Sequence, residues 1–343
     1  YVERLVSEIT QTGVLYAHPV AETAYIGGGT PTLLTPGQMR RVLDALNQSF
    51  PLAQDAEFSC EANPGMVSDA MLDTLRAGGV NRLSLGAQSA NAAELSLLGR
   101  QHTWRQVENA VARARRTGFD NLNIDLMMGL PGQTLATFED TLDAALALEP
   151  EHISCYGLIV EEGTPFAQGV LQGTLALPAE DEERAMVDLA LDRLTGAGFY
   201  RYEVSNYARP GRECKHNLNC WQRAPYLGFG AAGHSQMPGL AERRANPDTL
   251  EAYVSGQPAE IATLSPADQR FESVMLGLRM VQGVLLAGFQ AMHGVSLRDV
   301  YAAPMERAVA QGLAEMDERA FRLTLRGMDV MNAVLVDFLD EGQ

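Results

Sequence analysis

The chain has 343 residues, of which 46% are hydrophobic, so it can bury a large core in one big domain or in a barrel with a small appended domain. Its 43 acidic and 26 basic residues give a formal net charge of −17, which argues against a nucleic-acid backbone or an anionic membrane surface as the main partner. No stretch approaches the roughly 18 apolar residues of a transmembrane helix. Four cysteines are few for this length, and they predict a reducing, cytoplasmic location without disulfides.

Helix and strand patterns alternate from the first residue to about position 204. The spacing of Val2, Leu5, Val6 and Ile9 predicts a helix over the first dozen residues. Six strands are predicted at 24–26, 57–62, 82–86, 121–127, 152–159 and 200–204. The helices between them are predicted at 37–49, 68–77, 92–98, 104–117, 135–148 and 181–195.

Repeated strand–helix units with short connections predict parallel strands, because each crossover must return over the face of the sheet. A helix precedes the first predicted strand and has no strand before it. The fold class is therefore predicted as α/β, a partial (β/α)6 TIM-like barrel that lacks its first strand. In such barrels chemistry collects at the carboxyl ends of the strands.

The alternation is lost after Asn206. Residues 207–245 are predicted as a loop-rich linker, and helices are predicted at 247–254, 266–280 and 297–311. A short strand at 321–325, a turn at Gly327 and an apolar helix through Phe338 follow. We predict a barrel domain at 1–206, the linker at 207–245, and a small helical, winged-helix-like domain at 246–343.

The first predicted strand ends abruptly in Gly27-Gly28-Gly29-Thr30-Pro31. Three consecutive residues without Cβ leave backbone N–H and C=O groups open to a ligand, and they admit backbone angles that other residues avoid. This loop is a candidate ligand floor, with a simple tight turn as the alternative.

Polar residues follow the next strands. Glu61 could serve a ligand, be solvated or cap a helix, and Gln88 could bond ribose hydroxyls or cap a helix. Arg100 offers a forked donor for a carboxylate, although most such arginines make only surface pairs. Asp125 lies among apolar strand residues, where an acid must be paired or hydrogen-bonded, and this favours a functional role.

Taken in this order, the glycine loop, Glu61, Gln88, Arg100 and Asp125 resemble the oxygen-independent coproporphyrinogen III oxidase family, and within it the branch of HemW-type haem chaperones. The resemblance extends from residue 1 to about 340. It implies a radical S-adenosylmethionine (SAM) barrel in which Gly28, Gly29 and Thr30 hold the methionyl end of SAM. It also implies that the rest of the site is lined by Glu61, Gln88, Arg100, Asp125 and Ile159.

The family also implies a 4Fe-4S cluster held by a CxxxCxxC loop after the first barrel strand. None of the four cysteines here has that spacing. The loop is expected just before the opening helix, where the strand pattern also indicates a gap. We therefore expect the cluster ligands upstream of Tyr1 and predict no metal ligands within the chain; a protein that naturally lacks the cluster is the alternative.

A second segment runs from Cys214 to Trp221 and resembles the HNxxYW segment of the haem chaperones, with Cys220 at the tyrosine position. The resemblance implies that His216 is an axial ligand of haem iron, with Trp221 and Tyr226 as apolar walls. Two alternatives are a histidine satisfied by neighbouring backbone and a zinc site. The zinc site would use Cys214, His216, Cys220 and His234, but their spacing is not a recurrent structural-zinc pattern.

The resemblance thus implies a haem chaperone that binds haem and SAM and delivers haem to respiratory proteins. Coproporphyrinogen III oxidation in porphyrin biosynthesis is the alternative, because the two branches share the cofactor site. Another radical methyl or group transferase on the same barrel is a third, less specific possibility. The oligomeric state and the haem acceptor are left open.

Overall fold

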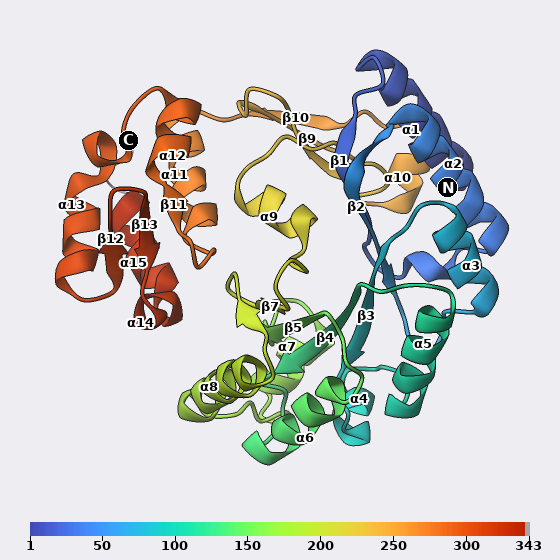
Figure 1. Cartoon of the computed structure of the whole chain (residues 1–343), viewed down its shortest axis with the longest axis horizontal. Coiled ribbons are helices and arrows are strands. Elements are labelled where there is room, and N and C mark those ends of the chain that lie inside the picture. Colours follow the sequence, from blue (N-terminus) through green and yellow to red (C-terminus); the bar gives the residue numbers. More distant parts are fainter. Residues whose placement is uncertain (340–343) are drawn as a thin grey trace. The chain divides into compact units, whose positions relative to one another are not determined.

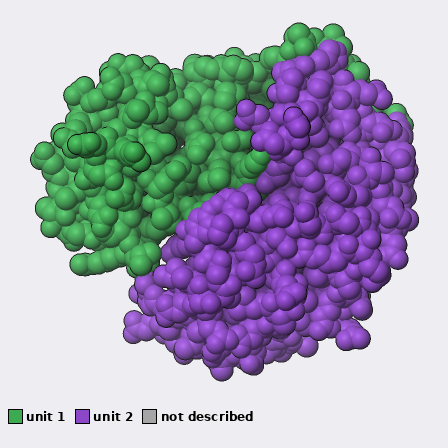
Figure 2. All heavy atoms as spheres, in the orientation of Figure 1, with its two compact units in different colours: residues 1–17, 202–204, 214–343 green, residues 18–201, 205–213 purple. Residues whose placement is uncertain are grey.

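The computed structural model describes residues 1–339, which form two compact units (Figure 2). Unit 1 consists of residues 1–17, residues 202–204 and the chain from 214 onward. Unit 2 consists of residues 18–201 and 205–213. The units interleave along the sequence, and the division into domains at 206 and 245 stays a prediction.

A seven-stranded open sheet forms the centre of unit 2 (Figure 1). Its strand order is β1 (Ala21–Ile26), β2 (Leu52–Ala62), β3 (Arg82–Gln88), β4 (Leu122–Met128), β5 (His152–Gly157), β7 (Asn206–Ala208) and β6 (Tyr200–Arg201). From β1 to β5 each strand runs parallel to its neighbour, as the repeated strand–helix units predict.

The last strand of the sheet differs from the expected series. Residues 200–204 are predicted as one strand that continues the parallel order, but β6 has two residues and does not pair with β5. Instead β7 pairs antiparallel with both β5 and β6. A short hairpin can take that edge because the side chains of Tyr207 and Ala208 are buried there.

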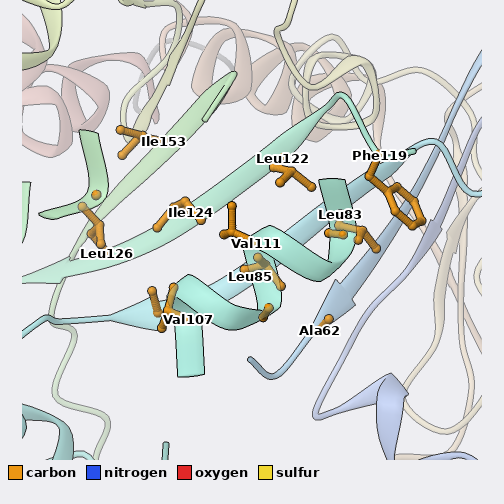
Figure 3. Packing of buried hydrophobic residues seen from close by; sticks show 14 of the residues in the cluster. Ala62, Leu83, Leu85, Val107, Val111, Phe119, Leu122, Ile124, Leu126 and Ile153 are labelled. Atoms are coloured by element: carbon orange, nitrogen blue, oxygen red, sulfur yellow. The ribbon is translucent and has the colours of Figure 1, made fainter. Parts of the chain in front are cut away.

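Helices cover one face of this sheet with apolar side chains. The covering helices are α2 (Pro36–Ser49), α3 (Asp69–Ala77), α5 (Trp104–Arg116), α6 (Leu135–Leu146) and α8 (Glu180–Gly196). Figure 3 shows Leu83, Leu85 and Ile124 of the sheet close to Val107 and Val111 of α5. Unit 2 also contains η1 (Pro31–Leu33), α4 (Ala92–Leu97) and α7 (Pro165–Leu171), the last of which the sequence pattern did not predict.

Phe119 is a large side chain of this core and is 1% exposed. It follows α5, and the guanidinium of Arg76 lies 5.8 Å from its ring centroid. We expect Phe119→Ala to lower the free energy of unfolding by about 3–5 kcal/mol. The substitution would remove the buried ring and leave a cavity in which the neighbouring side chains lose their contacts. Urea denaturation measures this loss. The control Leu171→Ala, at a side chain 87% exposed, should change stability by no more than about 0.5 kcal/mol, and equal effects would contradict the core assignment.

Unit 1 contains two small antiparallel sheets. The first has the order β10 (Glu260–Thr263), β9 (Glu242–Ala245) and β8 (His234–Gln236). This unit also includes α1 (Val2–Leu15), α9 (Lys215–Trp221) and α10 (Leu250–Val254). The segment 207–245, predicted as loop, therefore contains α9, β8 and β9, which are too short to show a clear hydrophobic period.

The C-terminal part of unit 1 begins with α11 (Pro266–Gly277), β11 (Val284–Leu285), α12 (Leu286–His293) and α13 (Leu297–Ala310). It continues with β12 (Ala314–Met316), β13 (Ala320–Leu323), α14 (Leu325–Asp329) and α15 (Met331–Leu339). The strand order β11-β13-β12 and the helices around it form a small domain with a separate core. Among the described residues no helix combines the length and the apolarity needed to cross a bilayer.

Candidate functional site

The face of the sheet opposite the covering helices carries polar side chains in two rows. The first row crosses β2 to β5 and consists of Glu61, Ser84, Asn123 and His152. The second row lies two residues nearer the carboxyl ends and consists of Asp125, Ser154 and Asn206, with Gly86, which has no side chain, next to Asp125. Alternate residues of a strand point to the same face, so both rows belong to one polar surface.

The glycine loop after β1 is held by the carboxylate of Glu61. Tyr25 donates its hydroxyl to Glu61 Oε1 at 2.8 Å, and the N–H of Gly28 donates to Oε2 at 3.1 Å. A Cβ at Gly27 would lie 2.8 Å from Glu61 Oε1, so the carboxylate needs the bare backbone there. Glu61 therefore fixes the loop, a role that the sequence did not distinguish from a solvated or capping acid.

The next two glycines leave open space on their side-chain faces. Gly28 has φ +83° and Gly29 has φ +61°, and no atom lies within 4 Å of a Cβ built on either residue. Residues other than glycine rarely adopt such backbone angles. The loop can thus offer bare peptide groups to a ligand, and the half-buried Thr30 follows it directly.

A bulge at the end of β3 brings Gln88 beside Asp125. The register of β3 with β4 shifts between Gly86 and Gln88, and Gln88 has φ +66° although it is not glycine. A Cβ on Gly86 would lie 2.9 Å from Gln88 Nε2, so the amide of Gln88 lies over that bare position. Gly86 pairs with Asp125 across the strands, which makes the two candidate side chains neighbours.

Asp125 is half-buried and hydrogen-bonded on both carboxylate oxygens. Asn123 donates to Oδ1 at 2.7 Å and Ser84 donates to Oδ2 at 2.9 Å. Burial raises the pKa of the Asp125 carboxyl above its usual value, and hydrogen bonds from Ser84, Asn123 and Ser154 oppose that rise. The negative charge of Glu61 also raises the pKa of Asp125.

Arg100 and Ile159 are not drawn into these contacts. Arg100 is exposed in the loop after α4, where its backbone N–H bonds to the carbonyl of Leu95 at 2.9 Å. Ile159 is 82% exposed in the loop after β5. Their roles at a cofactor stay predictions, whereas contacts or register connect Gly28, Glu61, Gln88 and Asp125.

Several residues of the polar surface were not singled out from the sequence. They are Tyr25, Ser84, Asn123, His152 and Ser154. The signal was present, because polar residues alternate with apolar ones in Arg82-Leu83-Ser84, Asn123-Ile124-Asp125 and His152-Ile153-Ser154. Polar and apolar residues alternate along these strands, so one face of the sheet packs against helices and the opposite, inner face is polar.

His216 lies in unit 1, on α9. Its Nε2 is 3.9 Å from Cys220 Sγ, one helical turn along, and both side chains are half-buried. Burial raises the pKa of the Cys220 thiol. Trp221 follows, with the guanidinium of Arg279 5.5 Å from its ring centroid, and Tyr226 is 41% exposed.

The four cysteines do not form a ligand set for an iron–sulfur cluster. Cys60 and Cys155 belong to the apolar core under the helices, and burial raises the pKa of each thiol to about 12. Within residues 1–339 no three His, Cys, Asp or Glu side chains are grouped to hold a metal ion. The zinc alternative at Cys214, His216, Cys220 and His234 has no such grouping among these residues.

Known proteins resemble this chain along nearly its whole length. It is 36% identical to the heme chaperone HemW of Bacillus subtilis over 348 aligned residues, covering 99% of this chain and 91% of that protein. The chain belongs to the HemW heme chaperone family. It is 34% identical to the HemW of Escherichia coli, covering 99% and 90% of the two chains. A mouse relative, the mitochondrial radical S-adenosyl methionine domain-containing protein 1, is 35% identical and covers 94% and 76%.

Two family models and one solved structure agree with this membership. The radical SAM superfamily model matches residues 2–145 and the HemN C-terminal domain model matches residues 264–330. The coproporphyrinogen III oxidase HemN of E. coli, described as a radical SAM enzyme, superposes with a TM-score of 0.82 at 26% identity, covering 98% of this chain and 82% of that one. The predicted fold class, a radical SAM partial barrel with a small C-terminal domain, is confirmed. Because the chain matches the radical SAM superfamily, SAM and a 4Fe-4S cluster are implied as cofactors.

The residues present fit SAM better than they fit a cluster. The open peptide groups of the glycine loop suit the charged methionyl end of SAM, and the acceptors of Asp125 and Gln88 suit the hydroxyls of its ribose. When bound to its cluster, SAM supplies radical chemistry in this superfamily. The residues described here can only bind and orient it.

Proposed function

We propose that this chain is a haem chaperone that binds SAM on the polar surface of unit 2 and haem at His216 of unit 1. Its membership in the HemW family supports the general class. The observation that carries the haem assignment is the geometry of α9, where His216 and Cys220 lie on one side and Trp221 follows.

His216 suits the role of axial ligand better than Cys220 does. A neutral imidazole presents a nitrogen lone pair to iron, whereas a cysteine binds iron as thiolate. The raised pKa of Cys220 keeps that thiol protonated near neutral pH. Trp221 supplies a flat apolar wall, and Arg279 beside it supplies a cation for a haem propionate.

For SAM, we propose that Gly28, Gly29 and Thr30 hold the methionyl end and that Gln88 and Asp125 hold the ribose. A carboxylate can accept a hydrogen bond from each hydroxyl of a ribose diol. Glu61 fixes the loop, while Arg100 and Ile159 would complete the site on the methionyl carboxylate and the adenine. This proposal rests on the contacts that gather the first residues and on the family resemblance for the last two.

Haem titration of the purified protein tests the haem assignment. We expect a shifted Soret band with the wild type and loss of that shift in His216→Ala. Cys220→Ser is the matched control on the same side of α9, and it should keep the wild-type spectrum. A His216→Ala variant with an unchanged Soret band would overturn the assignment.

Delivery to respiratory proteins is a separate part of the proposal. Haem-loaded protein mixed with haem-depleted respiratory membranes should transfer its Soret absorbance to the membrane pellet. Absence of transfer would remove the delivery step but leave haem binding intact. We place the protein in the cytoplasm because its four cysteines are free thiols, as a reducing compartment maintains them.

Coproporphyrinogen III oxidation is the second candidate, and the superposition on HemN favours it. An anaerobic assay with cluster, SAM and a reductant decides between the candidates. Formation of protoporphyrinogen IX at enzyme-like turnover would support oxidation. Haem binding without this product supports the chaperone.

A further inference from the structure

The side-chain amide of Asn123 is a fully satisfied junction in the polar surface. Its Nδ2 donates to Asp125 Oδ1 at 2.7 Å and to Ser84 Oγ at 2.7 Å. Its Oδ1 lies 2.6 Å from His152 Nδ1 and accepts from Ser154 Oγ at 3.1 Å. Asn123, Ser154 and His152 are all buried, so no solvent replaces a lost partner.

The direction of these hydrogen bonds follows from the acid at one end. An ionised Asp125 can only accept, so the NH₂ of Asn123 must face it and the carbonyl oxygen must face His152. His152 must then carry a hydrogen on Nδ1. Burial, with a contribution from the charge of Arg82, lowers the pKa of His152 well below its usual value, so the ring is neutral and has this single proton.

This chain of bonds determines which lone pairs Asp125 has left. One lone pair of Oδ1 is used by Asn123 and one lone pair of Oδ2 is used by Ser84. The hydroxyl of Ser154 has one hydrogen, which it donates to Asn123 Oδ1, so in this arrangement each oxygen of Asp125 keeps a second lone pair. The Asp125 side chain is also only half-buried. The carboxylate is thereby held with one acceptor on each oxygen for a pair of hydroxyl donors.

We propose that His152 is a positioning residue for SAM, which acts through Asn123 to orient Asp125 toward the ribose diol. This inference rests on the proposed assignment of Asp125 to the ribose. His152 itself does not touch the ligand. Without the Nδ1 donor, the amide of Asn123 can rotate and present its oxygen to Asp125, which repels the carboxylate and withdraws a donor from it.

Few other charged or titratable groups of the described residues act on the hydrogen-bonded series His152–Asn123–Asp125. The charge of Glu61 raises the pKa of Asp125, and the charge of Arg82 lowers the pKa of His152. The charge of Asp125 in turn raises the pKa of Cys155, which Arg201 lowers. The Cys155 thiol stays neutral at ordinary pH because its pKa is about 12. A change in the titration of Asp125 in a His152 variant can therefore be assigned to the Asn123 contact, provided that Glu61 is unchanged.

Two isosteric substitutions separate positioning from mere packing. In His152→Asn the amide nitrogen occupies the place of Nδ1 and keeps the donor, while in His152→Gln the polar group lies near the place of Nε2. We expect His152→Gln to weaken SAM binding about tenfold, the effect of one lost hydrogen bond to a charged network. The pH at which binding falls to half should move upward, because Asp125 becomes harder to ionise. His152→Asn should restore both values toward the wild type.

Calorimetric SAM titrations of the full chain from pH 4 to 8 measure both quantities, with thermal unfolding as a folding check. If His152→Gln does not fold, Asn123→Asp is the second variant, since it keeps the acceptor toward His152 but loses the donor toward Asp125. It must show an upward shift at least as large, because the new carboxylate also repels that of Asp125. If Asp125→Asn loses binding while His152→Gln and Asn123→Asp keep the wild-type affinity and pH profile, only the positioning role is overturned. If Asp125→Asn also binds normally, the proposed ribose site fails.

Discussion

Asp125→Ala should weaken SAM binding by at least about a hundredfold, because two hydrogen bonds to a charged acceptor contribute roughly 1.5–3 kcal/mol each. Asp125 is the one acid on β4 that faces the polar surface, and both of its oxygens keep free acceptor positions. Isothermal titration of the full chain with SAM measures the loss.

The Asp125→Asn variant gives the pH dependence of the same site. The folded pKa of Asp125 is raised, so the wild type should lose SAM affinity as the pH falls through this raised value, because the neutral acid no longer accepts two hydroxyl donors. Asp125→Asn should bind weakly at every pH and show no such step. Folding stability depends on pH in the opposite direction from SAM affinity: the contribution of Asp125 to stability improves as the pH falls. A raised carboxyl pKa means that the folded state binds the proton more tightly, so this group destabilises the fold above that pH and less below it.

Cys155→Ala is a matched control for both Asp125 variants. Cys155 is next to Ser154 on β5, but its side chain belongs to the apolar core beneath the helices. SAM affinity should therefore be unchanged in this variant. Wild-type affinity in Asp125→Ala, or an equal loss in Cys155→Ala, would contradict the ribose assignment.

The sequence predicted the elements that have strong periodicity. The strand–helix units from residue 21 to about 196 were predicted at nearly the observed positions, since their apolar positions pack in one core. It did not predict α9 and β8, because elements of seven and three residues show no clear period. It also misplaced the end of the sheet, where the antiparallel strand β7 takes the edge of β5.

The candidate site was predicted as a set of residues but not as a geometry. Three features of the site depend on tertiary contacts and cannot be recognised from the local sequence. These are the left-handed backbone of Gln88, the bulge beside Gly86, and the bond from Glu61 to the loop. The chain from His152 through Asn123 to Asp125 did leave a mark, in the alternation of polar residues along β4 and β5. That alternation indicates strands with one polar face, but it does not determine which polar side chains bond to one another.

Gly28→Val should reduce SAM binding below detection while leaving the protein folded. Valine is β-branched, and a backbone φ of +83° would strain it by about 1–3 kcal/mol. This strain is smaller than the free energy of unfolding of the whole chain, but it is large enough to displace one loop. The loop would relieve the strain by moving, and it would break the bond from the Gly28 N–H to Glu61. The new side chain would also fill the open space where the proposed ligand lies.

Gly37→Ala distinguishes loss of the bare loop from a general effect of adding a side chain. Gly37 lies in α2 and, like Gly28, has no atom within 4 Å of a Cβ, but its backbone is helical. Alanine is favoured over glycine by about 1 kcal/mol in a helix, so this variant should be at least as stable as the wild type and bind SAM normally. Both variants are measured by SAM titration and thermal unfolding. Retained affinity in Gly28→Val would mean that the ligand does not lie on this loop, because a β-branched side chain and SAM cannot share the same space above it.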